Sequence, residues 1–382
     1  MKKREALAGF VLVLWVGVGS TLLGAQETTE APVRGRMQSI YQALSSAFVV
    51  SLEPDEFQAA GNRQLILEAL DRIAAEARQL EGHSMVSSPG FKLLSGSLAE
   101  DASSALELFE AEDYPASRYF LGRLTGYCFA CHSRLPAATR LDVGQDLFEN
   151  PKVQALSSRE RMRLAVAARR FETAVTLGEE ILQSVDQSPA AIDLSGTIDD
   201  YLKLVLRVRG DFTRAARILK EFGQRPDLPE YLSSYIEVWL QALDNIQHNL
   251  DSDDKLALAR SLINHGRIQN EFPADRKGLI QFVVATSLLH QFVESPAVEI
   301  GDQAEAYYLL GVIEGSISHT WPSEGDFYLE ASIRLAPDSP FAEDSYVLLE
   351  EYLISGYMGM AGAEIPQEIQ DHLRDLRELI ER

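Results

Sequence analysis

The chain contains two cysteines, Cys128 and Cys131, which stand three residues apart and are followed directly by His132. Cys-x-x-Cys-His is the attachment motif of a c-type haem. Two thiols at this spacing lie near one face of a helix, so that each can add to a vinyl group of the porphyrin. The adjacent imidazole then reaches the iron as its proximal ligand. The sequence therefore predicts one covalently attached haem c, held by Cys128 and Cys131 and ligated by His132.

Three other kinds of site compete with this interpretation. A structural zinc site needs four Cys or His ligands, and the chain has no second cysteine pair. A thioredoxin-like redox pair requires a strand-to-helix context, whereas both flanks of the motif are helical in pattern. A plain disulfide beside a coincidental histidine stays open as the third alternative.

The N-terminal segment is typical of an export signal. A basic start over residues 1–4 precedes a run without charge over residues 6–26, and Ala25 offers a small residue for cleavage. We therefore expect a secretory signal peptide over residues 1–25 and a linker over 26–35. An uncleaved anchor is the alternative, because about twenty uncharged residues could just span a bilayer, and membrane association is expected only in that case. Export fits covalent haem attachment, which takes place outside the cytoplasm, so we expect a periplasmic protein.

Four amphipathic helices are predicted around the motif. Apolar residues recur at helical spacing in four stretches between residues 36 and 136. Pro54, a turn over residues 87–90 and Asp113 separate these stretches, and Pro136 ends the last one, which carries the motif. Helices of about 16–22 residues joined by modest loops are typical of an antiparallel four-helix bundle.

With this pattern, residues 36–136 resemble the cytochrome c′ type of class II c-type cytochromes. In that family a four-helix bundle carries its haem motif near the C-terminal end of the last helix. The segment Cys128–His132, which closes just before Pro136, matches this placement. The resemblance implies that Cys128 and Cys131 hold the haem and that His132 is the proximal ligand.

The sixth coordination position of the iron decides the chemistry. In an up-down-up-down bundle the end of the last helix lies beside the start of the first helix and the end of the second. Met37, at the start of the first helix, and His83, just past the second, are therefore the candidate distal ligands, beside a vacant site. Core packing is the alternative role of Met37, and solvation that of His83. Arg36 and Arg134 belong to the same end and are candidate partners of the haem propionates, with surface solvation as their alternative.

The remainder of the chain predicts stacked helical hairpins. Residues 137–157 have little periodicity and are expected to form a linker, whereas 158–382 is helical in pattern nearly throughout. Phe171 and Phe212 occupy equivalent places in two segments 41 residues apart. The stretch 306–337 is similar to a tetratricopeptide repeat, with aromatic-Leu-Gly on one helix and Phe and Ala on the next. The expected fold class is all-α: a four-helix bundle carrying one haem, followed by an α-solenoid.

Charge constrains the partners. The 382 residues carry a formal net charge of −22 with a sequence pI near 4.7, which argues against binding to nucleic acid. Residues 137–382 account for −18 of this charge. We therefore expect the helical array to attract a basic redox partner protein. Packing on the haem domain or building an oligomer is the alternative role of the array, and the oligomeric state is left open.

These observations together predict electron transfer rather than an enzymatic reaction. The sequence has no His-Glu-x-x-His metal motif, no glycine-rich phosphate loop and no Gly-x-Ser-x-Gly element. We expect an exported monohaem cytochrome whose helical array docks its partner. The alternatives are a haem protein that binds or senses NO or CO at a vacant distal site, and an assembly scaffold that contains a haem.

Overall fold

The computed structural model describes most of the chain, and every regular element in the described part is a helix. The described residues are 20–81, 89–136, 145–248, 250, 252–272, 274–295, 298–317, 324–358 and 365–382. The expected all-α class is confirmed for them. Within these ranges we find no helix with the length and apolar character that crossing a bilayer requires.

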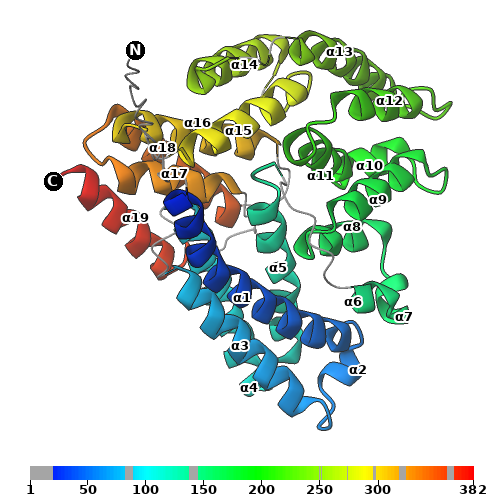
Figure 1. The fold of residues 1–382 in the computed structure, drawn as a ribbon, viewed down its shortest axis with the longest axis vertical. Coiled ribbons are helices and arrows are strands. Elements are labelled where there is room, and N and C mark those ends of the chain that lie inside the picture. The colour runs from blue at the N-terminus through cyan, green and yellow to red at the C-terminus, as the bar shows by residue number, and fades with distance from the viewer. Residues whose placement is uncertain are drawn as a thin grey trace, which may run out of the picture.

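The first five helices pack side by side in chain order. They are α1 (Ser20–Ser51), the short α2 (Pro54–Phe57), α3 (Arg63–Glu81), α4 (Pro89–Glu110) and α5 (Tyr114–His132). Helix α1 packs on α3, α3 on α4 and α4 on α5, as Figure 1 shows in the lower part of the molecule. Leu70, Ile73, Ala102 and Leu124 are fully buried between them. These five elements are the N-terminal helices.

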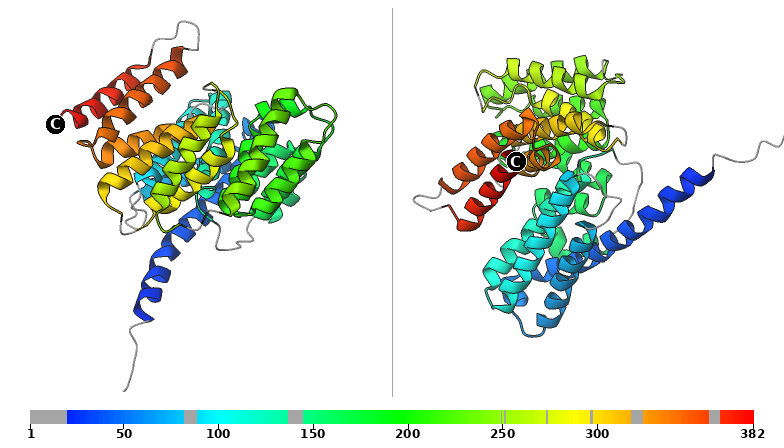
Figure 2. Two further views of the ribbon diagram at one scale, coloured as in Figure 1. Left: turned by 90° about the horizontal axis from the view of Figure 1, so that it is seen from above. Right: turned by 90° about the vertical axis from the view of Figure 1, so that its left-hand side faces the viewer.

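Helix α1 starts earlier than the sequence pattern indicates. We expected a linker over residues 26–35, but the helix begins at Ser20 and includes them. Ala, Gln and Glu, which have high helix propensity, are frequent between residues 25 and 31. Figure 2 shows this part of α1 projecting away from the rest of the molecule. Of the expected signal peptide, residues 1–19 lie outside the described residues.

The expected linker over residues 137–157 also contains structure. Two short helices, α6 (Gln145–Glu149) and α7 (Pro151–Gln154), occupy its second half, and the side chain of Asn150 caps α7 by accepting from the backbone nitrogen of Lys152 at 2.9 Å. Leu147 and Val153 are buried in a small cluster that also contains Tyr41 and Phe48 of α1. The segment therefore packs on α1, because its few apolar residues find a partner there.

The remaining elements are also helices and pack mainly on their neighbours in the chain. They are α8 (Ser158–Ala167), α9 (Phe171–Gln183), α10 (Pro189–Leu194), α11 (Thr197–Leu202), the π-helical turn η1 (Lys203–Val208), α12 (Phe212–Phe222), α13 (Glu230–Gln247), α14 (Lys255–Gln269), α15 (Leu279–Val293), α16 (Ile300–Ile317), α17 (Glu324–Leu335), α18 (Pro340–Met358) and α19 (Gln367–Ile380). In Figure 1 they form an arc above the N-terminal helices. The elements from α8 to α19 are the C-terminal helices.

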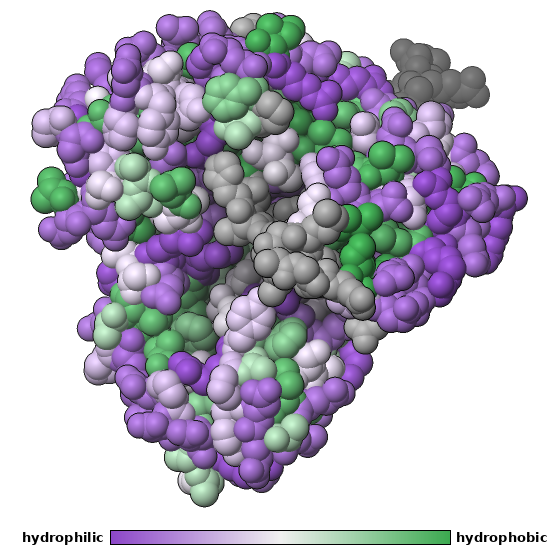
Figure 3. Space-filling view, turned by 180° about the vertical axis from the view of Figure 1, so that it is seen from behind, coloured by the Kyte–Doolittle hydropathy of each residue, from purple (hydrophilic) through white to green (hydrophobic). Residues whose placement is uncertain are grey.

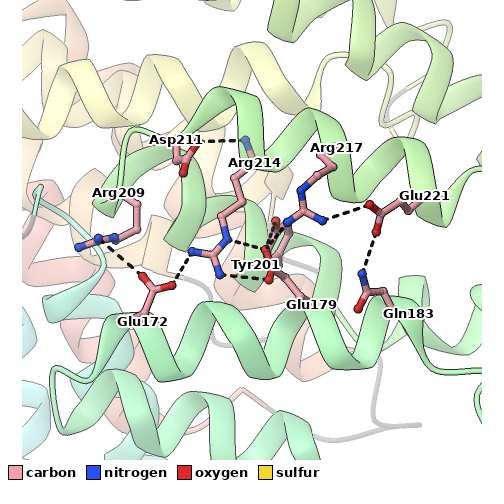
Figure 4. A network of polar contacts seen from close by, with 9 residues as sticks. All are labelled: Glu172, Glu179, Gln183, Tyr201, Arg209, Asp211, Arg214, Arg217 and Glu221. Atoms are coloured by element: carbon pink, nitrogen blue, oxygen red, sulfur yellow. Dashed lines mark hydrogen bonds and ion pairs between the residues drawn. The ribbon is translucent and has the colours of Figure 1, made fainter.

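Phe171 and Phe212, which are 41 residues apart in the sequence, occupy the same position in two helices of this arc. Phe171 is the first residue of α9 and Phe212 the first of α12, and both are buried. A network of ion pairs joins the same two helices, as Figure 4 shows. Arg214 on α12 donates to Glu179 of α9 at 2.6 and 3.0 Å and to Glu172 at 2.6 Å. The two helices are thus joined by apolar packing and by charge.

The arc contacts the N-terminal helices at two separate places. Near its start, α8 packs on α5, and near its end, α17 packs on α4. At the second contact, a Cβ atom placed on Gly90 would lie 3.0 Å from Tyr307 and 3.3 Å from Tyr328, so α4 begins directly against these rings. The C-terminal end of α5 lies within the arc, as Figure 1 shows. Figure 3 shows that hydrophilic side chains cover most of the opposite face, with small apolar areas between them.

Candidate functional site

The cysteine motif occupies the last turn of α5. Asp113 caps the start of this helix by accepting from the backbone nitrogen of Ala116 at 3.2 Å, and the helix closes where Ser133 donates to Phe129 at 2.9 Å. Cys128 and Cys131 are therefore one helical turn apart, both half-buried against the core of the N-terminal helices. No disulfide joins them. The two sulfurs consequently belong to one face of a regular helix, as the sequence pattern predicted.

The imidazole of His132 is oriented by the C-terminal helices. Helix α8 ends at Ala167, and the last carbonyls of a helix have no partner within it. The carbonyl oxygen of Val166 accepts from the backbone nitrogen of Arg169 at 2.8 Å and lies 3.0 Å from Nδ1 of His132. A hydrogen on Nδ1 leaves the lone pair on Nε2, which is the tautomer of a histidine that binds a metal through Nε2.

Burial sets the protonation of the motif. The pKa of His132 is lowered to about 4, chiefly by burial and also by the charge of Arg169. Hydrogen bonding to the backbone at Val166 and Ala167 acts in the opposite direction but is outweighed. The ring is therefore neutral at pH 7, as a metal ligand must be. Burial likewise raises the pKa of Cys128 to about 12. A thiol with a raised pKa is a weak nucleophile, which argues against a thioredoxin-like redox role.

These observations fit a c-type haem. The donor set is two thiols on one helical face and a neutral imidazole whose Nδ1 contacts a backbone carbonyl. In such a site Cys128 and Cys131 would hold the porphyrin and Nε2 of His132 would bind the iron. No competing metal site is visible in the part of the chain that the structure describes, where no cluster of three or more His, Cys, Asp and Glu side chains could hold an ion.

Phe129, inside the motif, anchors α5 in the C-terminal helices. Its ring is 2% exposed and belongs to their apolar core, and the guanidinium of Arg163 on α8 lies 5.4 Å from the ring centre. Two residues earlier, just before the motif, Tyr127 faces the other way and donates to Asp101 of α4 at 3.0 Å. Burial raises the pKa of both Tyr127 and Asp101. The motif is thus held from both sides.

The candidate distal ligands are only partly described. Met37 is half-buried and packs against the core of the N-terminal helices, and it lies within α1 rather than at its start. His83 lies outside the described residues. Arg36, a candidate propionate partner, donates to Glu76 of α3 at 3.0 Å and also to Gln79. Its guanidinium therefore joins α1 to α3 in this structure.

Arg134, the second candidate propionate partner, is buried beneath the arc. Only 4% of it is exposed, and its Nε donates to Nδ1 of His290 on α15 at 3.4 Å. Its Nη2 lies 3.4 Å from Glu294, and its guanidinium lies 5.7 Å from the centre of the Tyr328 ring. The surface-solvated alternative for Arg134 is therefore wrong, because the arc covers the residue.

The contacts of Arg134 continue into a buried charged cluster that the sequence analysis missed. Glu314 on α16 is fully buried, accepts from Arg207 at 2.6 Å and forms an ion pair with Lys203 at 2.8 Å, both on the π-helical turn. Nε2 of His290 lies 3.8 Å from the same carboxylate. A signal was present in the sequence: Lys203 and Arg207 are four residues apart in an otherwise apolar run, and Glu314 interrupts an apolar helix. Arg134, His290, Glu314, Lys203 and Arg207 are the buried cluster.

The C-terminal helices thus contact the motif and its flank at two points: Val166 lies beside His132, and His290 lies beside Arg134. Residues more than 150 positions apart, such as Arg134 and His290, come into contact at this point. In comparisons with known proteins, the chain matches no family model, no curated protein and no solved structure.

Proposed function

We propose that the protein is an exported monohaem c-type cytochrome that transfers electrons. In this proposal the N-terminal helices are a bundle of the cytochrome c′ type, and the C-terminal helices are an α-solenoid of tetratricopeptide-like hairpins that docks a partner protein. The observation that supports this proposal most directly is the geometry at His132. Its neutral imidazole lies at the end of α5, with Nδ1 at 3.0 Å from the Val166 carbonyl and two cysteines on the preceding turn.

The chain supplies three things to such a cofactor. Cys128 and Cys131 fix its position on α5. The Val166 carbonyl fixes the ring plane of His132, and this hydrogen bond makes Nε2 more electron-rich as a ligand. Apolar side chains beside the motif, Phe129 among them, are buried and give the site apolar surroundings. The haem itself would supply a reversible one-electron step between ferrous and ferric iron.

Docking of a basic redox partner is the role that we assign to the C-terminal helices. Residues 137–382 carry a net charge of −18. Several of their arginines are already engaged in ion pairs with acidic residues of the same helices, as at Arg214 with Glu172 and Glu179. A cationic partner would be attracted over the length of a Debye screening distance, so the association rate should fall as salt is added.

The ligand set of the iron is testable from an optical spectrum of the purified ferrous protein, recorded with and without CO. Low-spin bands that do not change with CO support electron transfer with a protein ligand in the sixth position. A high-spin spectrum that shifts at once on CO addition would contradict simple electron transfer and favour gas binding.

The source of a sixth ligand follows from two single variants. If the spectrum is low-spin, Met37→Ala and His83→Ala identify the ligand, because removal of the true ligand produces a high-spin spectrum. Leu65→Ala is the matched control, because Leu65 is an exposed apolar residue on α3. A low-spin spectrum that survives both ligand variants would exclude both residues.

A further inference from the structure

We propose that Arg169, which follows α8, sets the midpoint potential of the haem by holding a positive charge beside the proximal ligand His132. The inference rests on the proposed function and deepens it, because it makes the C-terminal helices part of the redox centre as well as a docking surface. A fixed charge near the iron shifts the balance between the ferric and the ferrous state through its field, and no bond to the haem is needed for this effect.

The backbone at the end of α8 holds Arg169 close to the ligand. The backbone nitrogen of Arg169 donates to the carbonyl oxygen of Val166 at 2.8 Å, and that of Arg170 donates to Ala165 at 2.8 Å. This pair of hydrogen bonds is the Schellman motif, which fixes the backbone just past a helix end. The oxygen of Val166 also lies 3.0 Å from Nδ1 of His132. One carbonyl therefore contacts both the backbone of Arg169 and the imidazole.

The charge of Arg169 reaches the imidazole of His132. It is among the causes that lower the pKa of His132. The guanidinium of Arg34 on α1 is near enough to lower the pKa of Arg169 in turn, so a second cation adds to the first. Within the part of the chain that the structure describes, the side chain of Arg169 forms no ion pair, and its buried Nε has no acceptor. A chain with a formal net charge of −22 thus places positive charge beside its proposed iron ligand.

The conformation of Arg169 supplies a matched position elsewhere in the chain. Its φ is 55°, in the left-handed region that favours glycine. Glu112 takes the same place past the end of α4, with a φ of 63°. A cation at a helix end also stabilises the helix through its dipole, and this is the alternative role of Arg169. The two roles can be separated, because a helix-end contact affects stability whereas a charge near the iron affects the potential.

Removal of this charge should lower the midpoint potential, because a nearby cation favours the ferrous state, which carries one positive charge fewer than the ferric state. At roughly 12 Å from the iron, a unit charge changes the equilibrium about tenfold at an effective dielectric constant near 20, and about threefold near 40. These factors correspond to about 30–60 mV for a one-electron couple.

The test uses the haem-loaded full chain with three substitutions of Arg169. Arg169→Gly removes the side chain and relieves the left-handed backbone, so the fold should be kept. Arg169→Gln removes the charge but keeps the stem near Phe171, whose ring centre lies 5.9 Å from the guanidinium. Arg169→Lys retains the charge. We expect the threefold to tenfold fall in the first two variants, and less than half of it in Arg169→Lys.

Glu112→Gly is the matched control. It makes the same backbone change at an exposed residue. Helix α5 runs from Tyr114 to His132, so about 27 Å at 1.5 Å per residue separates the control position from the ligand. This distance exceeds the Debye length of about 8 Å at physiological salt. The potential should therefore not change in Glu112→Gly.

Each outcome decides the inference. Covalent haem content is measured first, and a wild-type chain without haem would overturn the proposed function itself. With haem in place, an unchanged potential in Arg169→Gly and Arg169→Gln would overturn the inference alone. An equal fall in Arg169→Lys or in Glu112→Gly would do the same, because the charge would then not be the cause. Failure of both neutral variants to take up haem would assign Arg169 a structural role and would also contradict the inference.

Discussion

Replacement of Phe129 by Ala should separate the N-terminal helices from the C-terminal helices. The ring is 2% exposed, and burial of an aromatic side chain removes about 150–250 Å² from water. Truncation to Ala loses roughly 120 Å² of this area, or about 3 kcal/mol at 25 cal/mol per Å². The cation–π contact with Arg163 at 5.4 Å adds about 0.5–1 kcal/mol. We therefore expect a loss of about 4 kcal/mol, within the range of about 3–5 kcal/mol for such truncations.

Urea denaturation of the full chain measures this loss with two probes. Tryptophan fluorescence, to which the buried Trp239 contributes, follows the C-terminal helices, and the absorbance of the proposed haem would follow α5. The two transitions should coincide in the wild type and separate in Phe129→Ala, because Phe129 joins the two cores. Phe129→Leu, which keeps most of the volume, should cost less than about 1.5 kcal/mol. A loss below about 1 kcal/mol in Phe129→Ala with coincident transitions would refute this account of the junction.

Three further predictions concern the C-terminal helices. Gly311→Ala should cost about 1–3 kcal/mol in thermal melts, because the new Cβ would lie 2.5 Å from Leu329 where α16 crosses α17. Arg214→Gln should cost about 2 kcal/mol in urea, since it removes charge-assisted hydrogen bonds that join α9 to α12. The hydrogen bond of His372 to Glu330 raises the pKa of His372 above its ordinary value. The docking of α19 should therefore weaken as the pH rises from about 6.5 through this raised pKa, and hydrogen exchange of α19 measures the change.

Each of these predictions has a matched control. Gly301 lies on the same helix as Gly311 with nothing within 4 Å of an added Cβ, so Gly301→Ala should not lower the melting temperature. Arg217 is 52% exposed, and Arg217→Gln should change stability by less than about 0.5 kcal/mol. His372→Gln should abolish the pH dependence of α19 above about pH 6.5. If a control variant shows the effect that is expected of the test variant, or if the test variant shows no effect, the structural contact behind that prediction is contradicted.

The pH prediction for α19 has a defined sign. The folded-state pKa of His372 is above the unfolded value of 6.5, so its contribution is fully present below that value and is lost as the pH rises. For Glu330, burial raises the pKa, but the hydrogen bonds and charges of His372 and Arg334 together outweigh burial and leave the pKa below 4.5. Its contribution is therefore present above 4.5 and is lost in acid. Docking of α19 should be strongest between about pH 4.5 and 6.5.

Local patterns in the sequence predicted the all-α class and the position of the motif on a helix. Apolar periodicity located α3, α4 and α5, since each buries one face. The start of α1 and the helices α6 and α7 were not predicted. Short segments carry little periodicity, and whether Leu147 and Val153 form a helix or a loop depends on the apolar surface of α1 beside them.

The surroundings of the motif could not be predicted, because distant parts of the chain supply them. His132 is oriented by the backbone carbonyl of Val166, and a carbonyl has no sequence signature. The contact between Arg134 and His290 joins residues 156 positions apart. Arg207 and Glu314 did carry a signal, as isolated charges in apolar helices, but the pattern does not say which charges meet. Only the packing of α15, α16 and η1 makes them neighbours.

The intact mass of the mature protein, produced in a host that attaches c-type haem, tests the central claim most directly. We predict the polypeptide mass plus the mass of one haem, retained after denaturation because thioether bonds are covalent. The Cys128→Ser, Cys131→Ser chain should show the polypeptide mass alone. A wild-type protein at the bare polypeptide mass, or lighter by two hydrogens through a Cys128–Cys131 disulfide, would contradict the proposed cytochrome.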